Sequence, residues 1–209
     1  MATDLNIRVI SNLGDTEFFT LYQQDINLNV KNYKVGAWEK GYIAPGAQFY
    51  TVLPLKIQAQ GRVEESDGIY KTKLVDVDYN QRYDIFNNSE GIDIERSDLR
   101  PPVDNTMSVY NVTDSRVQAV VLKDSKPLFS ADIRPDNKLN FAIMPSIYVA
   151  ICDYAIEQEF FDAASLSPLT RINFEGQSYL TITLGENIST GKFEINYNFD
   201  LFDLSTVTY

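Results

Sequence analysis

The chain repeats one ordered set of motifs after about 100 residues. The shared motifs are an Ile-X-Pro triplet, a large apolar residue four positions after its proline, and an apolar-Pro pair: Ile43-Ala44-Pro45, Phe49 and Leu53-Pro54 in the first half, and Ile133-Arg134-Pro135, Leu139 and Met144-Pro145 in the second. Upstream, Val9 precedes Val109 by the same interval. Such a period is too long for a solenoid and suits a duplicated β-sandwich. We therefore expect two related domains.

The fold class expected from these motifs is all-β, as two tandem Ig-like antiparallel β-sandwiches related by internal duplication. Apolar and polar residues alternate with a period of two, as in Ile182 and Leu184 between threonines, which is typical of half-buried strands. The prolines at 101 and 102 predict a stiff linker. We expect one sandwich at 1–99, the linker at 100–105 and the second sandwich at 106–209.

Seventeen strands are expected. They are Asn6–Ser11, Glu17–Gln23, Ile26–Asn32, Gln48–Val52, Leu55–Gln60, Ile69–Val77, Gln81–Phe86 and Ile92–Glu95 in the first half, and Met107–Val112, Arg116–Lys123, Phe129–Ile133, Lys138–Ile143, Ile147–Asp153, Arg171–Asn173, Gln177–Leu184, Lys192–Asn198 and Leu201–Leu204 in the second. One helix is predicted at Tyr154–Ala164, where apolar residues share a helical face.

Side chains expected to point inward are Val9, Ile57, Tyr70, Ile85, Val109, Val149, Tyr179 and Ile195. If the halves are related, Pro45 should correspond to Pro135, Tyr70 to Tyr179 and Tyr83 to Phe193. The apolar C-terminus is expected to dock on its own domain or to pair with a neighbouring subunit.

The charge is acidic throughout. There are 11 basic and 16 acidic residues up to Asp104, and 7 and 13 after it, which gives −5 and −6 and a total of −11. This charge repels nucleic-acid phosphates and anionic lipid head groups. We therefore expect no nucleic-acid partner and no membrane partner.

The chain contains no histidine and one cysteine, Cys152. The lack of histidine removes Ser-His-Asp and Cys-His catalysis and most transition-metal sites. Cys152 lies in an apolar strand pattern, so it is predicted to be a buried, unreactive thiol. Carboxylate pairs remain as a possible hydrolytic machinery, but none stands out from the 29 acidic residues.

Two weak candidate sites remain. Asp76, Asp78 and Asn80 have the spacing that opens a calcium loop, although the glycine and the final glutamate of an EF-hand are missing. The alternative is a strand end that displays both carboxylates before a turn at Asn80. Tyr33, Trp38 and Tyr42 lie in a glycine-flanked stretch and could stack on a sugar or anchor a partner. The alternative is that Trp38 caps the first core.

The functional expectation is a noncatalytic binding or self-assembling interaction protein, whose partner is another protein or a second copy of itself. The alternatives are a carbohydrate-binding or membrane-acting defence protein, a lectin or toxin component, and a carboxylate-dependent hydrolase. No cofactor is expected, with calcium as the one possibility. The N-terminus lacks a charged and apolar secretion signal, so a cytoplasmic location is the default, with non-classical export as the alternative.

Overall fold

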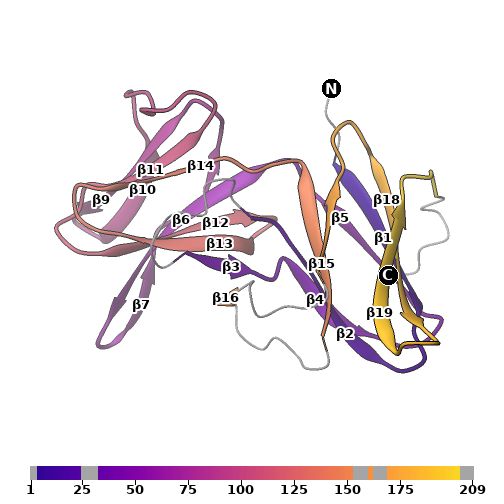
Figure 1. Cartoon of the computed structure of the whole chain (residues 1–209). Coiled ribbons are helices and arrows are strands. Elements are labelled where there is room, and N and C mark those ends of the chain that lie inside the picture. Colours follow the sequence, from indigo (N-terminus) through magenta and orange to yellow (C-terminus); the bar gives the residue numbers. More distant parts are fainter. Residues whose placement is uncertain (1–3, 25–32, 153–159, 162–168, 203–209) are drawn as a thin grey trace.

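The computed structural model describes residues 4–24, 33–152, 160–161 and 169–202. These residues form nineteen strands in four sheets, with no helix among them (Figure 1). The prediction of an all-β chain is confirmed. The sheets lie in two groups, and in each group two sheets face each other in a sandwich-like arrangement (Figure 1).

The first group, here called sandwich I, contains two four-stranded sheets. One has the order β19-β18-β1-β5, with β1 at Leu5–Asn12, β5 at Gln48–Leu53, β18 at Tyr179–Asn187 and β19 at Lys192–Asn198. The other has the order β17-β15-β2-β4, with β2 at Glu17–Tyr22, β4 at Glu39–Ile43, β15 at Ser146–Cys152 and β17 at Leu169–Asn173.

The second group, sandwich II, combines a four-stranded and a seven-stranded sheet. The smaller sheet has the order β10-β9-β11-β14, with β9 at Arg82–Asn88, β10 at Gly91–Arg96, β11 at Met107–Asn111 and β14 at Lys138–Phe141. The larger sheet has the order β16-β3-β13-β12-β6-β7, with β3 at Lys34–Gly36, β6 at Ile57–Glu65, β7 at Gly68–Lys71, β12 at Val117–Lys123, β13 at Lys126–Ile133 and β16 at Phe160–Phe161. A short β8 at Val75–Val77 also pairs with β6.

The strand pairing does not follow the expected division into 1–99 and 106–209. β1 pairs in parallel with β18, and β2 pairs with β15, so sandwich I takes strands from both ends of the chain. The segment 100–105 connects β10 to β11, which belong to one sheet of sandwich II. The chain passes between the sandwiches at Pro54, from β5 to β6, and at Pro145, from β14 to β15. It also enters sandwich II at the short strands β3 and β16, whose neighbours along the chain belong to sandwich I.

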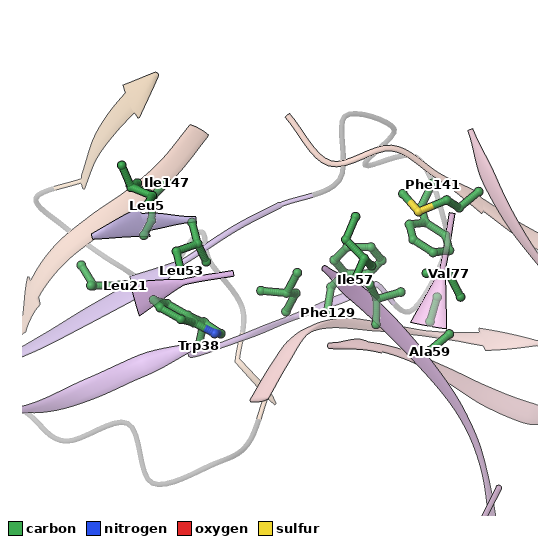
Figure 2. Close-up of a cluster of buried hydrophobic side chains, with 14 of the residues drawn as sticks. Leu5, Leu21, Trp38, Leu53, Ile57, Ala59, Val77, Phe129, Phe141 and Ile147 are labelled. Carbon is green, nitrogen blue, oxygen red and sulfur yellow. The ribbon is translucent and has the colours of Figure 1, made fainter. Parts of the chain in front are cut away.

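The apolar core continues through both sandwiches. Figure 2 shows Leu5, Leu21, Trp38, Leu53 and Ile147 of sandwich I on one side, and Ile57, Ala59, Val77, Phe129 and Phe141 of sandwich II on the other. All of them belong to one cluster of buried side chains. The outer face of the β15–β2 sheet carries a second, smaller cluster, which contains the buried thiol of Cys152 as the sequence predicts.

Most expected core residues are confirmed. Five are buried: Val9, Ile57, Ile85, Val109 and Val149. Tyr179 and Ile195 are half-buried. The prediction for Tyr70 is wrong, because its side chain is 48% exposed on β7. Figure 1 shows the β6–β7 hairpin reaching beyond the body of sandwich II.

Several element predictions differ from the structure. β3 and β4 were not expected, and 69–77 is divided into β7 and β8. Of the predicted helix, the structure describes only Phe160–Phe161, which form β16 and not a helix. The expected strand at 26–32 lies outside the described residues. Residues 201–202 are not in a strand, but Phe202 packs on the outer face of the β18–β1–β5 sheet, against Arg8, Tyr50 and Tyr179. Residues 203–209 lie outside the described part.

Candidate functional site

A polar pocket of about 330 Å³ lies on the outer face of the large sheet of sandwich II. Its lining comes from β6, β7, β13, β12 and the residue before β12: Arg62, Glu64, Ile69, Arg116, Gln118 and Asp132. We call this the sheet pocket. Three of these residues, Arg62, Glu64 and Ile69, belong to the hairpin that β6 and β7 form. Figure 1 shows this hairpin at the edge of the sheet.

Strand register places the central side chains of the sheet pocket in one row. Gln118 on β12 lies opposite Asp132 on β13 and opposite Arg62 on β6. The next residue, Ala119, is fully buried in the core. Because successive side chains of a strand point to opposite faces, Gln118 and its two cross-strand partners face outward. The register therefore presents an amide, a carboxylate and a guanidinium side by side.

The pocket carries charges of both signs, in contrast to the acidic chain as a whole. Arg62 and Arg116 supply guanidinium groups, and Glu64 and Asp132 supply carboxylates. The Nε of Arg62 donates a hydrogen bond to Gln60 Oε1 at 3.2 Å, which holds the base of that side chain in place. Fixed donors and acceptors next to the apolar Ile69 suit a ligand that has both charged and apolar groups.

The β6–β7 hairpin forms one wall of the pocket and has a rigid tip. Only Ser66 and Asp67 separate the paired residues Glu65 and Gly68. The hydroxyl of Tyr70 donates to Asp67 Oδ2 at 2.7 Å. This contact with a carboxylate raises the pKa of the Tyr70 phenol above its ordinary value. Ile69 and Tyr70 are 60% and 48% exposed, so the hairpin offers two large side chains to a partner.

β7 also has an outer edge with no strand partner among the described residues. The N–H of Thr72 donates to the carbonyl of Gly61 at 3.0 Å, so these two residues form a hydrogen-bonded pair. Hydrogen-bonded pairs alternate along an antiparallel ladder, and the next one is Val63 with Tyr70. The N–H and carbonyl groups of Ile69 and Lys71 therefore point away from β6, toward the open side.

The three aromatic residues proposed from the sequence do not share an exposed surface. Trp38 is only 2% exposed, with the Lys126 ammonium 5.4 Å from its ring centroid, so its ring packs in the core. Tyr33 is half-buried and stacks on Phe129 at 5.3 Å. Of the three, only Tyr42 is well exposed, at 67%. Trp38 thus lies where the alternative interpretation, a cap on the core, would put it.

The proposed calcium residues are engaged by protein groups. Lys56 Nζ lies 2.7 Å from Asp76 Oδ2, and this hydrogen bond holds the pKa of the carboxyl below its ordinary value. Asn80 is in a turn with φ 60°, and its Oδ1 accepts a hydrogen bond from the N–H of Asn105 at 2.7 Å. Asp78 is exposed one residue after β8. Within the described ranges, no group of three or more acidic, cysteine or histidine residues is placed to hold a metal ion.

Asn80 instead fixes the segment that the sequence identified as a linker. Its N–H donates to the carbonyl of Thr106 at 2.8 Å, in addition to the bond with Asn105. A pocket of about 490 Å³ opens beside this contact, lined by Asn80, Gln81, Arg100, Pro101, Asp104 and Asn105. The linker is therefore docked on the turn between β8 and β9.

Sequence reasoning did not find the sheet pocket. Arg62 and Glu64 alternate with apolar residues, which only indicates the solvent face of a strand. The pocket arises because β12 brings Gln118 between β6 and β13, and that pairing joins residues 56 positions apart on one side. No local pattern reports such a neighbour.

Comparison with known proteins gave no relative: no protein-family model matches the chain, and no curated protein matches it significantly. In the part of the chain that the structure describes, no helix has the length and apolar character needed to cross a membrane.

Proposed function

We propose that this chain is a noncatalytic interaction protein that binds an extended segment of a protein partner along β7 and the sheet pocket. The observation that carries the proposal is the position of the open backbone edge at Ile69 and Lys71, directly beside a pocket that contains charges of both signs. Strand addition uses main-chain hydrogen bonds for affinity and neighbouring pockets for specificity.

The two parts of this site have separate roles in the proposal. The outward N–H and carbonyl groups of Ile69 and Lys71 bond a strand of any sequence. Arg116 and Glu64 discriminate among strands, because they carry opposite charges at the rim of the pocket. A preferred segment therefore alternates between acidic and basic side chains on the face that meets the pocket.

A displayed library of random peptides tests the proposal. The chain should enrich peptides with alternating charges, and Ile69→Pro should weaken their binding by about tenfold or more, because proline removes an outward N–H donor. Ile69→Thr is the matched control, since it shortens the side chain and keeps the donor. Arg116→Glu should weaken binding as well, whereas Arg134→Glu, the same charge change at an exposed turn, should not.

Two results would contradict the strand-addition site. One is peptide binding that Ile69→Pro leaves unchanged while its far-ultraviolet circular dichroism matches that of the parent chain. The other is a failure to enrich any peptide together with binding on a glycan array, which would favour the carbohydrate-binding alternative.

We further propose that the two sandwiches are Ig-like and derive from a tandem duplication. The support is the repeated set of motifs, together with strand neighbours that agree between the sandwiches. Pro45 and Pro135 each lie in the turn between equivalent strands, β4–β5 and β13–β14. The expected match of Tyr70 with Tyr179 is wrong, because β7 is an edge strand of the larger sheet of sandwich II whereas β18 lies inside a sheet of sandwich I.

A further inference from the structure

The smaller sheet of sandwich II and the β1 sheet of sandwich I have the same plan. β1 is parallel to β18 and antiparallel to β5, with β19 beyond β18. β11 is parallel to β9 and antiparallel to β14, with β10 beyond β9. The opposing sheets also agree, because β2 lies between β15 and β4, and β12 lies between β6 and β13. Seven strands of sandwich I therefore have equivalents in sandwich II: β1, β2, β4, β5, β15, β18 and β19 correspond to β11, β12, β13, β14, β6, β9 and β10.

The register agrees to the residue. Val9 lies opposite Phe49, and Val109 lies opposite Leu139. The two valines are 100 residues apart in the sequence, and their partners are 90 residues apart. The facing sheets agree in the same way. Phe19 lies opposite Gly41 and Ile151, and Ala119, 100 residues later, lies opposite Ala131 and Gly61. Gly41 and Ala131 are 90 residues apart, and so are Gly61 and Ile151. On the parallel side, Val9 faces Ile182 and Val109 faces Tyr83. The expected match of Tyr83 with Phe193 is therefore wrong, because the residue equivalent to Tyr83 is Ile182.

The turn after each Ile-X-Pro triplet has the same hydrogen bonds. The N–H of Gly46 donates to the carbonyl of Ser11 at 2.9 Å, and the N–H of Asp136 donates to that of Asn111 at 2.9 Å. Both donor residues have a left-handed backbone, with φ 73° and 57°. An L-residue adopts this conformation at a cost, so its presence at Asp136 marks a turn shape that is retained without glycine.

Each sandwich is built from strands of both halves of the chain. Let repeat 1 be 1–99 and repeat 2 be 106–209. Apart from β3 and β16, which both lie in the large sheet of sandwich II, each repeat has a front half, β1–β5 or β11–β14, and a rear half, β6–β10 or β15–β19. The front half of repeat 1 pairs with the rear half of repeat 2 in sandwich I. The front half of repeat 2 pairs with the rear half of repeat 1 in sandwich II. Each repeat changes sandwich at the matched prolines, Pro54 and Pro145.

We infer that the chain is a swapped dimer of one repeat unit, carried on a single polypeptide, in which the binding partner of each repeat is a second copy of that repeat. This inference rests on the duplication proposed above. Each repeat meets the other along strand edges: β1 and β2 pair with β18 and β15, and β11 and β12 pair with β9 and β6. The linker joins the outer strand β10 to β11, two places away in the same sheet, so it is not needed to hold either sandwich together.

Cutting the linker of the full chain tests the inference. A recognition sequence for a specific protease is inserted between Leu99, which is 60% exposed, and Arg100, and the folded protein is cleaved. We expect native mass spectrometry to give the mass of the whole chain after cleavage. Separation into two folded species of half that mass would overturn the inference, because each repeat would then close on itself.

A cysteine pair identifies the neighbour of β1 in the cut protein. Arg8→Cys with Thr181→Cys, in a Cys152→Ala background, joins residues that are register partners across the two repeats. Oxidation should link the fragments into one band on a non-reducing gel. Ser108 lies opposite Arg82 in the equivalent position, so Arg8→Cys with Arg82→Cys is the matched control, and both thiols should remain titratable.

A disulfide in the control pair, or fragments that stay together without the 8–181 link, would overturn the inference. The peptide-binding test with Ile69→Pro involves only the edge of β7. Its result therefore stands whether or not the repeats are exchanged, and the two proposals fail separately.

Discussion

Lys123 shows how far one side chain departs from the usual behaviour of its type. It is the last residue of β12, it is only 4% exposed, and burial of the ammonium lowers its pKa to about 8, with a partly opposing effect from Asp4. A lysine in water titrates near 10.5. Because the folded chain releases this proton more easily than the unfolded chain, charged Lys123 opposes folding at neutral pH.

Replacing Lys123 with methionine should therefore stabilise the protein at pH 7, by an amount on the order of 1–3 kcal/mol. In the parent, the unfolded state binds more protons between pH 8 and 10.5, so the Lys123 contribution to stability should rise through that window. The variant should lack this rise. Urea unfolding at pH 7 and pH 10 measures both effects, and a variant that is less stable at pH 7 would show that the ammonium makes a stabilising contact.

Val149 is a simpler case at the same scale. It is fully buried on β15 and belongs to the core cluster that runs through both sandwiches. Val149→Ala should lower the free energy of unfolding by about 1–3 kcal/mol, from lost burial and the cavity left behind. Chemical unfolding measures the loss, and the exposed residue Val112 provides the control, because Val112→Ala should change stability little.

The sequence predicted single residues well where a strand lies inside a sheet. Val9 and Val109 alternate with polar neighbours and are buried as expected. Tyr70 follows the same pattern, but it lies on a hairpin that reaches beyond the body of sandwich II, so its side chain is only partly covered. Alternation reports which face a side chain takes, not whether that face is covered.

At the scale of elements, β3 is held against β13 by a close approach of two backbones. A β-carbon on Gly36 would lie 2.4 Å from the carbonyl oxygen of Pro127, which belongs to β13. β3 in turn pairs with β16, so this contact attaches both short strands to sandwich II. The glycine is needed for its size rather than for an unusual φ.

Gly36→Ala should separate β3 from β13 and cost about 1–3 kcal/mol of stability. Gly185→Ala is the matched control within a strand, since the nearest atom to its added β-carbon is 3.9 Å away. Melting temperatures of the two variants make the comparison. Equal melting temperatures would show that β3 contributes nothing to stability.

Sixteen of the nineteen strands overlap expected ranges, because their alternation is visible without knowing their neighbours. β3 and β4 were missed, since glycines at 36 and 41 and a tryptophan between them are typical of a loop. β16, at Phe160–Phe161, lies where a helical pattern was read. Short strands such as these depend on pairing rather than on local pattern.

At the scale of the whole molecule, the two sandwiches are joined by a continuous core and by a chain that passes repeatedly from one to the other. The same cluster of buried side chains contains residues of both sandwiches, so unfolding of one sandwich exposes apolar side chains of the other. We expect a single calorimetric transition whose van't Hoff and calorimetric enthalpies agree. In Val149→Ala the whole transition should shift, and a second peak that stays in place would show that sandwich II melts independently.

The exchange of halves was beyond the reach of the sequence. A strand of the rear half shows the same alternation whether it pairs with its own front half or with that of the other repeat. The repeated motifs are the same in both arrangements. Strand pairings such as those of β1 with β18 and of β2 with β15 distinguish them.

The path through Pro54 and Pro145 also sets an order in which the chain can be completed as it is made. Residues 57–141 contain every strand of sandwich II except β3 and β16. They leave the ribosome before β15 does. The strands of 5–53 emerge first, yet Asn6 meets its partner Ser178 only 172 residues later. The earliest part of the protein therefore waits with unpaired strand edges on β1 and β2 until β18 and β15 arrive, which makes it the segment most in need of chaperone protection during synthesis.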